Sequence, residues 1–578
     1  MLGVFALAAC TGEFGTPGAT TLPSEERPRE APETFACDPT QVPEALTLRR
    51  LTRDQLLRSI DDIMAELAPA SVTSVRSALT STAARIPDDL ATDALDYRRM
   101  SQDVGQAHVD GYYEVARRVA RAVTDDPERL ADALGDCATD GDPANDESCV
   151  QGFLTRFGRL AFRRPLSQAE IDHYAPPIDI AAPAFSDRVR HLITALLMAP
   201  NFVYLLELGG EEVSANTYEI DAFELASRLS FHFWQTGPDE ALLQAAESGE
   251  LLTDAGYEAE VDRLYADPRS QETLALFFED WLRLHEVPEM DAAVGRADFQ
   301  AYAGADLPGP ALRQEMIDDV LALTRHVVES NGTVAELFTT RLSFAPSQAV
   351  ADLYGGAPLY TPGSPPAELP AGPRSGLLSR PALLANNQAT TRPILRGALI
   401  RQRVLCDELE LPENMDDVNL GGEVGQSTRE QVEALTESPG TVCAGCHALL
   451  NPLGFAFEEY DALGRFRQSE QVFDEAGELV AEYPVNSETQ VTISFGEEGF
   501  VRNGAELSAL IAESAKTEAC FARQYFRFAF GRHEHLDRDS CTLEAMRTVL
   551  AEGGSIQDLF RQVAEQPEFR LVRKEAAQ

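Results

Sequence analysis

Apolar residues recur three and four positions apart along most of the chain, which is the spacing of one face of an α-helix. Four segments show this pattern most clearly: residues 48–64, 109–135, 150–163 and 504–570. Residues 471–500 differ, because residues 490–495 alternate between polar and apolar side chains, as a strand with one buried face does. The pattern predicts a mainly α fold, a multi-domain helical body with a small β segment near residues 471–500.

Start and stop signals locate helices in the middle of the chain. Asp221 and Glu224 stand three residues apart ahead of an apolar run, which is the spacing of a capping box. The turn Gly237-Pro238 is expected to end that helix. Residues 277–282 place Phe, Phe, Trp and Leu at helical spacing. We assign this stripe to core packing, because aromatic side chains spaced in this way usually face a core.

Composition divides the chain into six expected segments. Residues 11–45 are rich in Pro, Gly, Thr and Glu, and residues 346–374 hold many Pro and Gly. We expect a lipoprotein signal and flexible tether over 1–45, helical modules over 46–135, 136–212 and 213–345, an irregular connection with a cysteine-motif module over 346–470, and a β segment with a C-terminal helical module over 471–578.

The charge of the chain excludes one class of partner. The 578 residues hold 94 acidic and 48 basic side chains, for a formal net charge of −46. Phosphate contacts need a positive surface, so we expect no nucleic-acid partner. The hydrophobic fraction of 44% argues against general disorder. No uncharged apolar stretch reaches about 18 residues, so we expect no membrane-spanning helix.

The first residues carry a candidate lipidation signal. The run Leu7-Ala8-Ala9-Cys10 resembles a bacterial lipobox, in which the signal is cut before a cysteine that is then lipidated. No Lys or Arg precedes the apolar run, which departs from the usual signal peptide. We expect Cys10 to anchor the protein by a lipid in the cell envelope, at the periplasmic or outer-membrane surface. The alternative is an ordinary apolar N-terminus.

The sequence Cys443-Ala444-Gly445-Cys446-His447 has the pattern of c-type haem attachment. Two thiols add across the two haem vinyl groups, and the next histidine becomes the proximal iron ligand. Random placement of the nine cysteines and nine histidines predicts about 0.002 such motifs in the chain. We therefore expect haem c on Cys443, Cys446 and His447, with His447 as the metal ligand.

Other chemistry remains open for the same motif. Cys443 and Cys446 could form a redox or structural disulfide, although no thioredoxin-like βαβ pattern surrounds them. A zinc site is a third alternative, with His447 and Cys406 as further ligands, although a second Cys-x-x-Cys is missing. The sixth iron position has three candidates by residue type alone: Met415, His533 and His535.

An exported chain lies in an oxidising compartment, where disulfides persist. Once Cys10 is assigned to the lipid and the motif pair to haem, six cysteines remain: Cys37, Cys137, Cys149, Cys406, Cys520 and Cys541. We expect a disulfide between Cys137 and Cys149, which flank a short acidic loop, and another between Cys520 and Cys541.

Arginines gather in stretches that hold no acid. Between Glu368 and Asp407 the chain has six arginines and no carboxylate side chain, and residues 148–169 form a second such island. Four of the arginines are candidate ligands for an anion, such as haem propionates or a substrate carboxylate: Arg392, Arg396, Arg401 and Arg403. The alternative is that they pair with the surplus carboxylates of the protein itself.

Short motifs along the chain resemble five successive modules of large exported proteins of planctomycetes and myxobacteria. Residues 50–55 resemble DUF1587, residues 162–166 with 199–204 resemble DUF1595, and residues 226–230 with 234 and 238–240 resemble DUF1592. The DUF1588 motif lies in residues 396–397, 406, 443–447, 451–455 and 460–465, and the DUF1585 motif in residues 530–532. The resemblance implies a cell-envelope protein that often occurs with cytochrome-like modules. It implies no particular reaction.

Taken together, the sequence predicts an envelope lipoprotein with one covalent haem, which serves electron transfer or haem-dependent oxidoreduction. A redox partner protein is the expected partner, besides the membrane that holds the lipid anchor. The alternative is a non-catalytic surface binding or scaffold protein in which Cys443 and Cys446 form a disulfide. The sequence leaves open whether the protein is an enzyme.

Overall fold

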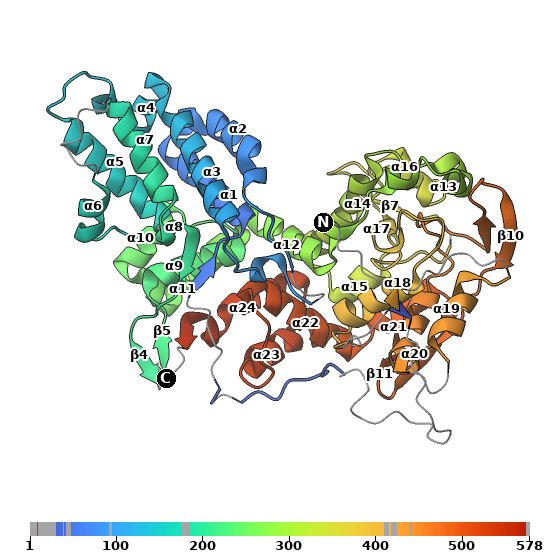
Figure 1. Cartoon of the computed structure of the whole chain (residues 1–578). Helices are drawn as coiled ribbons and strands as arrows, with labels where there is room; N and C mark the ends of the chain where they lie inside the picture. Colours follow the sequence, from blue (N-terminus) through green and yellow to red (C-terminus); the bar gives the residue numbers. More distant parts are fainter. Residues whose placement is uncertain are drawn as a thin grey trace. The chain divides into compact units, whose positions relative to one another are not determined.

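The computed structural model describes residues 8–9, 30–38, 40–41, 48–91, 95–175, 184–214, 216–370, 372–409, 416–417, 425–438 and 442–573. Most elements in these ranges are helices, and the sheets have two or three strands each (Figure 1). The predicted mainly α fold is confirmed. None of the helices in the described part combines the length and apolar character that a membrane crossing needs.

The chain forms two compact units, each assembled from separated segments. The motif unit, which contains the Cys-x-x-Cys-His sequence, comprises Met1–Ala36, Ala275–Phe526 and Leu543–Phe560. The second unit comprises Cys37–Leu274, Arg527–Thr542 and Arg561–Gln578.

The second unit is built mainly from helices α1 to α11 (Figure 1). Their bounds are α1 (Arg53–Leu67), α2 (Val72–Thr82), α3 (Gln106–Thr124), α4 (Pro127–Leu134), α5 (Asp146–Ala161), α6 (Gln168–Tyr174), α7 (Phe185–Leu197), α8 (Pro200–Val203), α9 (Ala222–Phe233), α10 (Glu240–Ser248) and α11 (Asp254–Ala266). Helix α3 packs against α2 and α7, and α1 against α5. Leu56, Phe157 and Leu196 belong to one continuous core between these helices.

One helix start and one capping pattern differ from the sequence prediction. Helix α1 begins at Arg53 because Thr52 and Gln55 form a capping box, so the preceding residues form strand β2 (Leu48–Arg50), paired with β3 (Tyr204–Leu206). Asp221 does cap α9 by accepting from the Phe223 amide at 2.9 Å. The predicted capping box is wrong, because Glu224 instead accepts from the amides of Leu208 and Gly209.

Helices and two hairpins make up the motif unit. Its helices are α13 (Ala297–Ala303), α14 (Leu312–Glu329), α15 (Val334–Thr339), α16 (Gln348–Leu353), α17 (Pro381–Leu384), α18 (Pro393–Leu399), α19 (Thr428–Thr436), α20 (Val442–Phe455) and α21 (Gly504–Ala512). Helices α12 (Arg269–Trp281), α22 (Ala515–Phe530), α23 (Ser540–Ala551) and α24 (Ile556–Glu565) have residues in both units. The predicted stripe over 277–282 is core, since its aromatic side chains are at most 1% exposed.

The predicted β segment is confirmed as two antiparallel hairpins. These are β9 (Ser469–Phe473) with β10 (Leu479–Pro484), and β11 (Thr489–Ser494) with β12 (Glu497–Val501). Gly477 turns the first hairpin with φ of 82°, a value that suits glycine. The sequence pattern missed the short strands β4 (Glu212–Ser214), β5 (Thr217–Glu219) and β13 (Leu571–Arg573), and the pairs β6 (Leu342–Ser343) with β7 (Ala367–Glu368) and β1 (Ala8–Ala9) with β8 (Asp416–Asp417).

Three disulfides join the six cysteines that the sequence left over for disulfides: Cys37–Cys541, Cys137–Cys149 and Cys406–Cys520. The prediction for Cys137 and Cys149 is confirmed. The predicted bond between Cys520 and Cys541 is wrong, because α22 continues for about 15 Å beyond Cys520 before it ends. Cys520 is buried and bonded to Cys406 within the motif unit. Cys10 lies outside the described residues.

Candidate functional site: the cysteine motif on helix α20

The Cys-x-x-Cys-His sequence forms the first two turns of α20 in the motif unit (Figure 1). Cys443, Cys446 and His447 occupy positions i, i+3 and i+4, and residues at that spacing share one face of a helix. The helix therefore presents two sulfur atoms and one imidazole on the same side.

The two cysteines are in different redox states. Cys443 is buried and disulfide-bonded. Cys446 is a half-buried free thiol whose pKa is raised by desolvation. The alternative in which Cys443 and Cys446 form a disulfide with each other is therefore wrong.

A chain of hydrogen bonds fixes the imidazole of His447. Its Nδ1 lies 3.0 Å from Oδ1 of Asn451, whose side chain is fully buried. The Asn451 amide group donates to Oγ1 of Thr436 at 2.9 Å and to Oε1 of Glu437 at 2.8 Å.

These partners determine the tautomer of His447. The Glu437 carboxylate can only accept, so the amide nitrogen of Asn451 must face it and the amide oxygen must face His447. His447 then carries its proton on Nδ1, which leaves the lone pair on Nε2. Within the described part of the chain, Nε2 makes no hydrogen bond or ion pair.

Two glycines allow α18 and α20 to pack backbone against backbone. A Cβ atom on Gly397 would lie 2.0 Å from the carbonyl oxygen of Leu450, and one on Gly454 would lie 1.9 Å from that of Pro393. Neither separation is compatible with a side chain. This contact explains Gly397 and Gly454 in the sequence motifs and sets the position of α20.

Arg396 forms hydrogen bonds with the backbone of the segment that follows α20. Its guanidinium group donates to the carbonyl oxygens of Leu384, Phe457, Tyr460 and Asp461 at 2.9–3.1 Å and pairs with Glu458 at 3.3 Å. The side chain is 5% exposed. Its hydrogen-bonding capacity is used within the protein.

The other three predicted anion ligands are placed as follows. Arg401 donates to carbonyl oxygens on α20 and β11, including Thr492 at 2.6 Å, and pairs with Asp407 at 3.1 Å. Arg403 is 2% exposed, and its carbonyl oxygen accepts from the Trp281 indole. Arg392 is half-buried and precedes the first turn of α18. Arg396 and Arg401 therefore follow the alternative of pairing within the protein.

The remaining candidate ligands are found as follows. Met415 lies outside the described residues. His533 and His535 belong to the second unit, and Nε2 of His533 lies 2.7 Å from Asp96. Cys406 is used in its disulfide, so the zinc alternative that includes it is wrong. The described residues hold no group of three or more His, Cys, Asp or Glu side chains that could bind a metal ion.

Sequence reasoning missed the side chains that support the motif. Asn451 could have been found, because it lies four residues after His447 on the same helical face. Glu459, just beyond α20, could not. Its burial raises the pKa of the carboxyl group to about 7, and no local pattern announces that burial.

The fold and the site define a mainly helical, multi-module protein with a single Cys-x-x-Cys-His helix. Four family models, each described as a protein of unknown function, match the chain: DUF1595 over residues 149–207, DUF1592 over 220–355, DUF1588 over 374–470 and DUF1585 over 500–569. The motif helix falls within the DUF1588 match. No curated protein and no solved structure matches the chain.

The matches confirm the resemblance for four of the five modules, in the predicted order. None of these four matches covers residues 50–55, so the resemblance of that segment to DUF1587 stays a prediction. The segment boundaries drawn from composition also stay predictions.

Proposed function

We propose that this protein is a cell-envelope c-type haem protein that serves electron transfer or haem-dependent oxidoreduction. The observation that carries the proposal is the geometry of α20, where Cys446 and His447 share a face and Asn451 holds Nδ1 of His447. An orienting hydrogen bond on one ring nitrogen is the usual arrangement around a histidine that ligates a metal through the other.

Two of the three residues that haem attachment needs, Cys446 and His447, could bind haem without any prior chemical change. Cys446 offers a free thiol and His447 offers Nε2. Cys443 fits once its disulfide is reduced, because a thioether forms from a thiol. Bound haem would supply a one-electron iron couple at this helix. A redox partner protein follows from an electron-transfer role.

The proposed location is the cell envelope, with Cys10 as the lipid anchor. The three disulfides among the described cysteines support export, because disulfides are rare in reducing compartments. Mass spectrometry of the protein from a membrane fraction tests the anchor. A diacylglycerol on the Cys10 sulfur is the expected result, and a Cys10 that is free or disulfide-bonded would refute it.

The haem proposal is tested by producing the full chain with and without cytochrome c maturation machinery. With the machinery, we expect the mass of one haem to persist under denaturing conditions, and Cys446→Ser to lower its yield. His447→Ala should retain the covalent mass and change the absorbance of the iron. His191→Ala is the matched control, because His191 is an exposed histidine of the second unit. Absence of haem mass under both conditions would refute the proposal.

The second candidate is a non-catalytic surface binding or scaffold protein. The disulfide of Cys443 favours it, because that bond removes one of the two thioether sites for haem. Arg396 and Arg401 favour it too, because their guanidinium groups bind within the protein and not to haem propionates. Under this alternative, the Cys443 bond persists in protein isolated from cells that contain the maturation machinery. A thioether between Cys443 and haem in that protein, identified by mass spectrometry of the haem-bearing peptide, would exclude it.

A further inference from the structure

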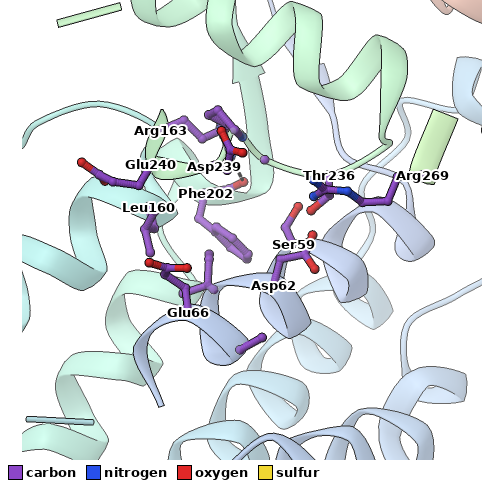
Figure 2. Close-up of a pocket in the computed structure, with 14 residues that line it drawn as sticks. Ser59, Asp62, Glu66, Leu160, Arg163, Phe202, Thr236, Asp239, Glu240 and Arg269 are labelled. Atoms are coloured by element: carbon purple, nitrogen blue, oxygen red, sulfur yellow. Dashed lines mark hydrogen bonds between the residues drawn. The ribbon is translucent and has the colours of Figure 1, made fainter. Parts of the chain in front are cut away.

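The second unit contains a cavity of about 320 Å³, separate from the cysteine motif. Its walls come from α1, the end of α5 and the residues after it, α8, and the turn between α9 and α10 (Figure 2). This volume is at the lower end of the range for small-molecule sites. Arg163 and the residues Pro238-Asp239-Glu240, which the sequence motifs of two modules singled out, lie in its lining.

The arginines of the lining form no ion pair with its acids, although the charge of Arg269 acts on Asp62 and Asp239. Arg163 donates to the carbonyl oxygens of Asn201, Phe202 and Tyr204, and burial lowers its pKa to about 10. Arg269 is held in a two-point pair with Asp267 at 3.0 and 2.8 Å. Both guanidinium groups are therefore used within the protein.

Two of the lining carboxylates are also used. Asp239 forms a two-point pair with Arg263 at 2.8 and 3.0 Å and accepts from the Leu242 amide at the start of α10. Glu240 lies 3.2 Å from Arg159. Their charges are compensated by these neighbours.

Asp62 and Glu66 are the less strongly compensated carboxylates of the lining, since Arg269 and Arg58 act on Asp62 only through their charges and not through an ion pair. They lie one turn apart on α1, and within the described residues neither forms an ion pair. Both are accessible to solvent, so a ligand can reach them. Desolvation raises the pKa of Asp62, although the Thr236 hydroxyl group and the charges of Arg269 and Arg58 oppose the rise.

A buried hydroxyl group also points to a ligand. Thr236 is 1% exposed and lines the cavity, and its hydroxyl group is close enough to Asp62 to lower the pKa of that carboxyl group, although no regular hydrogen bond joins them. A buried hydroxyl group whose hydrogen bonding is incomplete is unfavourable, so native sites usually supply a further partner. Figure 2 shows Thr236 beside Asp62 and Ser59, with Phe202 and Leu160 farther along the cavity.

We infer that this cavity binds a protonated aliphatic amine. The ammonium group donates to the Asp62 carboxylate and to Oγ1 of Thr236, and the aliphatic stem lies against Phe202 and Leu160. Glu66 receives a second ammonium group when the ligand is a diamine. An anion is disfavoured because the exposed carboxylates of Asp62 and Glu66 would repel it, and a neutral alcohol would leave Asp62 without an ion-pair partner.

Calorimetric titration of the full chain with pentane-1,5-diamine, at physiological ionic strength, tests the inference. We expect saturable binding of the diamine and none of pentan-1-ol, which has the same stem without the charge. Asp62→Asn should weaken binding by about tenfold or more, because a charge-assisted hydrogen bond is lost. Thr236→Val should weaken it by about threefold to tenfold.

The matched control is Asp61→Asn, which removes the same charge from the same helix. Asp61 is paired with Arg76 and does not line the cavity. A protein with a net charge of −46 attracts any cation, and that general attraction would weaken equally in both variants. Equal losses in the two variants, equal binding of pentan-1-ol, or no saturable binding would each overturn the inference. Thr236→Ser keeps the hydroxyl group and should keep the affinity if Thr236→Val does not fold.

Discussion

Glu459 gives the motif unit a specific dependence of stability on pH. Its side chain follows α20, is 7% exposed, and accepts a hydrogen bond from the amide of Gly504 at 3.2 Å, at the first turn of α21. Burial is the largest influence on the carboxyl group and raises its pKa from 4.5 to about 7, although the Gly504 amide and the charge of Arg374 oppose the rise.

The raised pKa fixes the sign of the effect. Between pH 4.5 and 7 the native state holds the proton that the unfolded chain has released, so stability falls as pH rises through this window. One pKa unit corresponds to about 1.4 kcal/mol, so the rise from 4.5 to about 7 corresponds to about 3 kcal/mol. The contribution is fully present below pH 4.5 and lost above pH 7.

Glu459→Gln removes the titration and keeps the shape of the protonated side chain. We expect the variant and the parent protein to be equally stable near pH 4.5, and the variant to be more stable by about 3 kcal/mol at pH 8. Because the chain has two compact units, global unfolding need not be a single transition. Hydrogen exchange in α21, next to the carboxyl group, reports the local free energy of opening.

Comparison of variant and parent at the same pH cancels the intrinsic pH dependence of exchange. Glu475→Gln is the control, because Glu475 is exposed in the first hairpin turn and should leave exchange in α21 unchanged at both pH values. A Glu459→Gln effect of equal size at both pH values, or one larger at pH 4.5, would refute the reasoning.

The helix crossing and the histidine support give two further predictions. Gly397→Ala should destabilise the motif unit by about 1–3 kcal/mol, because its Cβ would overlap the Leu450 carbonyl group. Thermal unfolding measures this loss. The control Gly295→Ala should leave stability unchanged, because the space around a Cβ at Gly295 is open. Asn451→Leu should remove the preference of His447 for the Nδ1-protonated tautomer, which nitrogen NMR of the imidazole detects without haem; an unchanged spectrum would contradict the role of Asn451.

Local patterns in the sequence predicted those parts of the fold that local physics determines. Helical spacing indicated α5 and the C-terminal helices because each buries one face, and alternation over residues 490–495 indicated β11 for the same reason. The disulfide Cys137–Cys149 was predictable because it closes a short loop.

Partners far apart in the chain could not be predicted in this way. Cys406 and Cys520 are 114 residues apart, and only tertiary packing brings their sulfur atoms together. The start of α1 also depends on a distant partner. The apolar pattern extends back to Leu48, but α1 begins only at Arg53, because Thr52 caps it and the preceding residues of β2 pair with β3. For the motif itself, the sequence located Cys446 but gave no information on its redox state.

The arginine island near the motif shows how a charge pattern can be real and yet misdirect. The absence of acids between Glu368 and Asp407 does mark a special region, because Arg396 and Arg401 are buried there beside α20. Both arginines bind mainly neutral carbonyl oxygens, and their single compensating acids are supplied by Glu458 and Asp407. Each of these two acids also pairs with a second cation, Glu458 with Arg467 at 2.9 Å and Asp407 with Lys516 at 2.8 Å. Such shared pairing favours a fixed helix over an open anion site, because a further anion would have to displace carbonyl or carboxylate partners that are already in place.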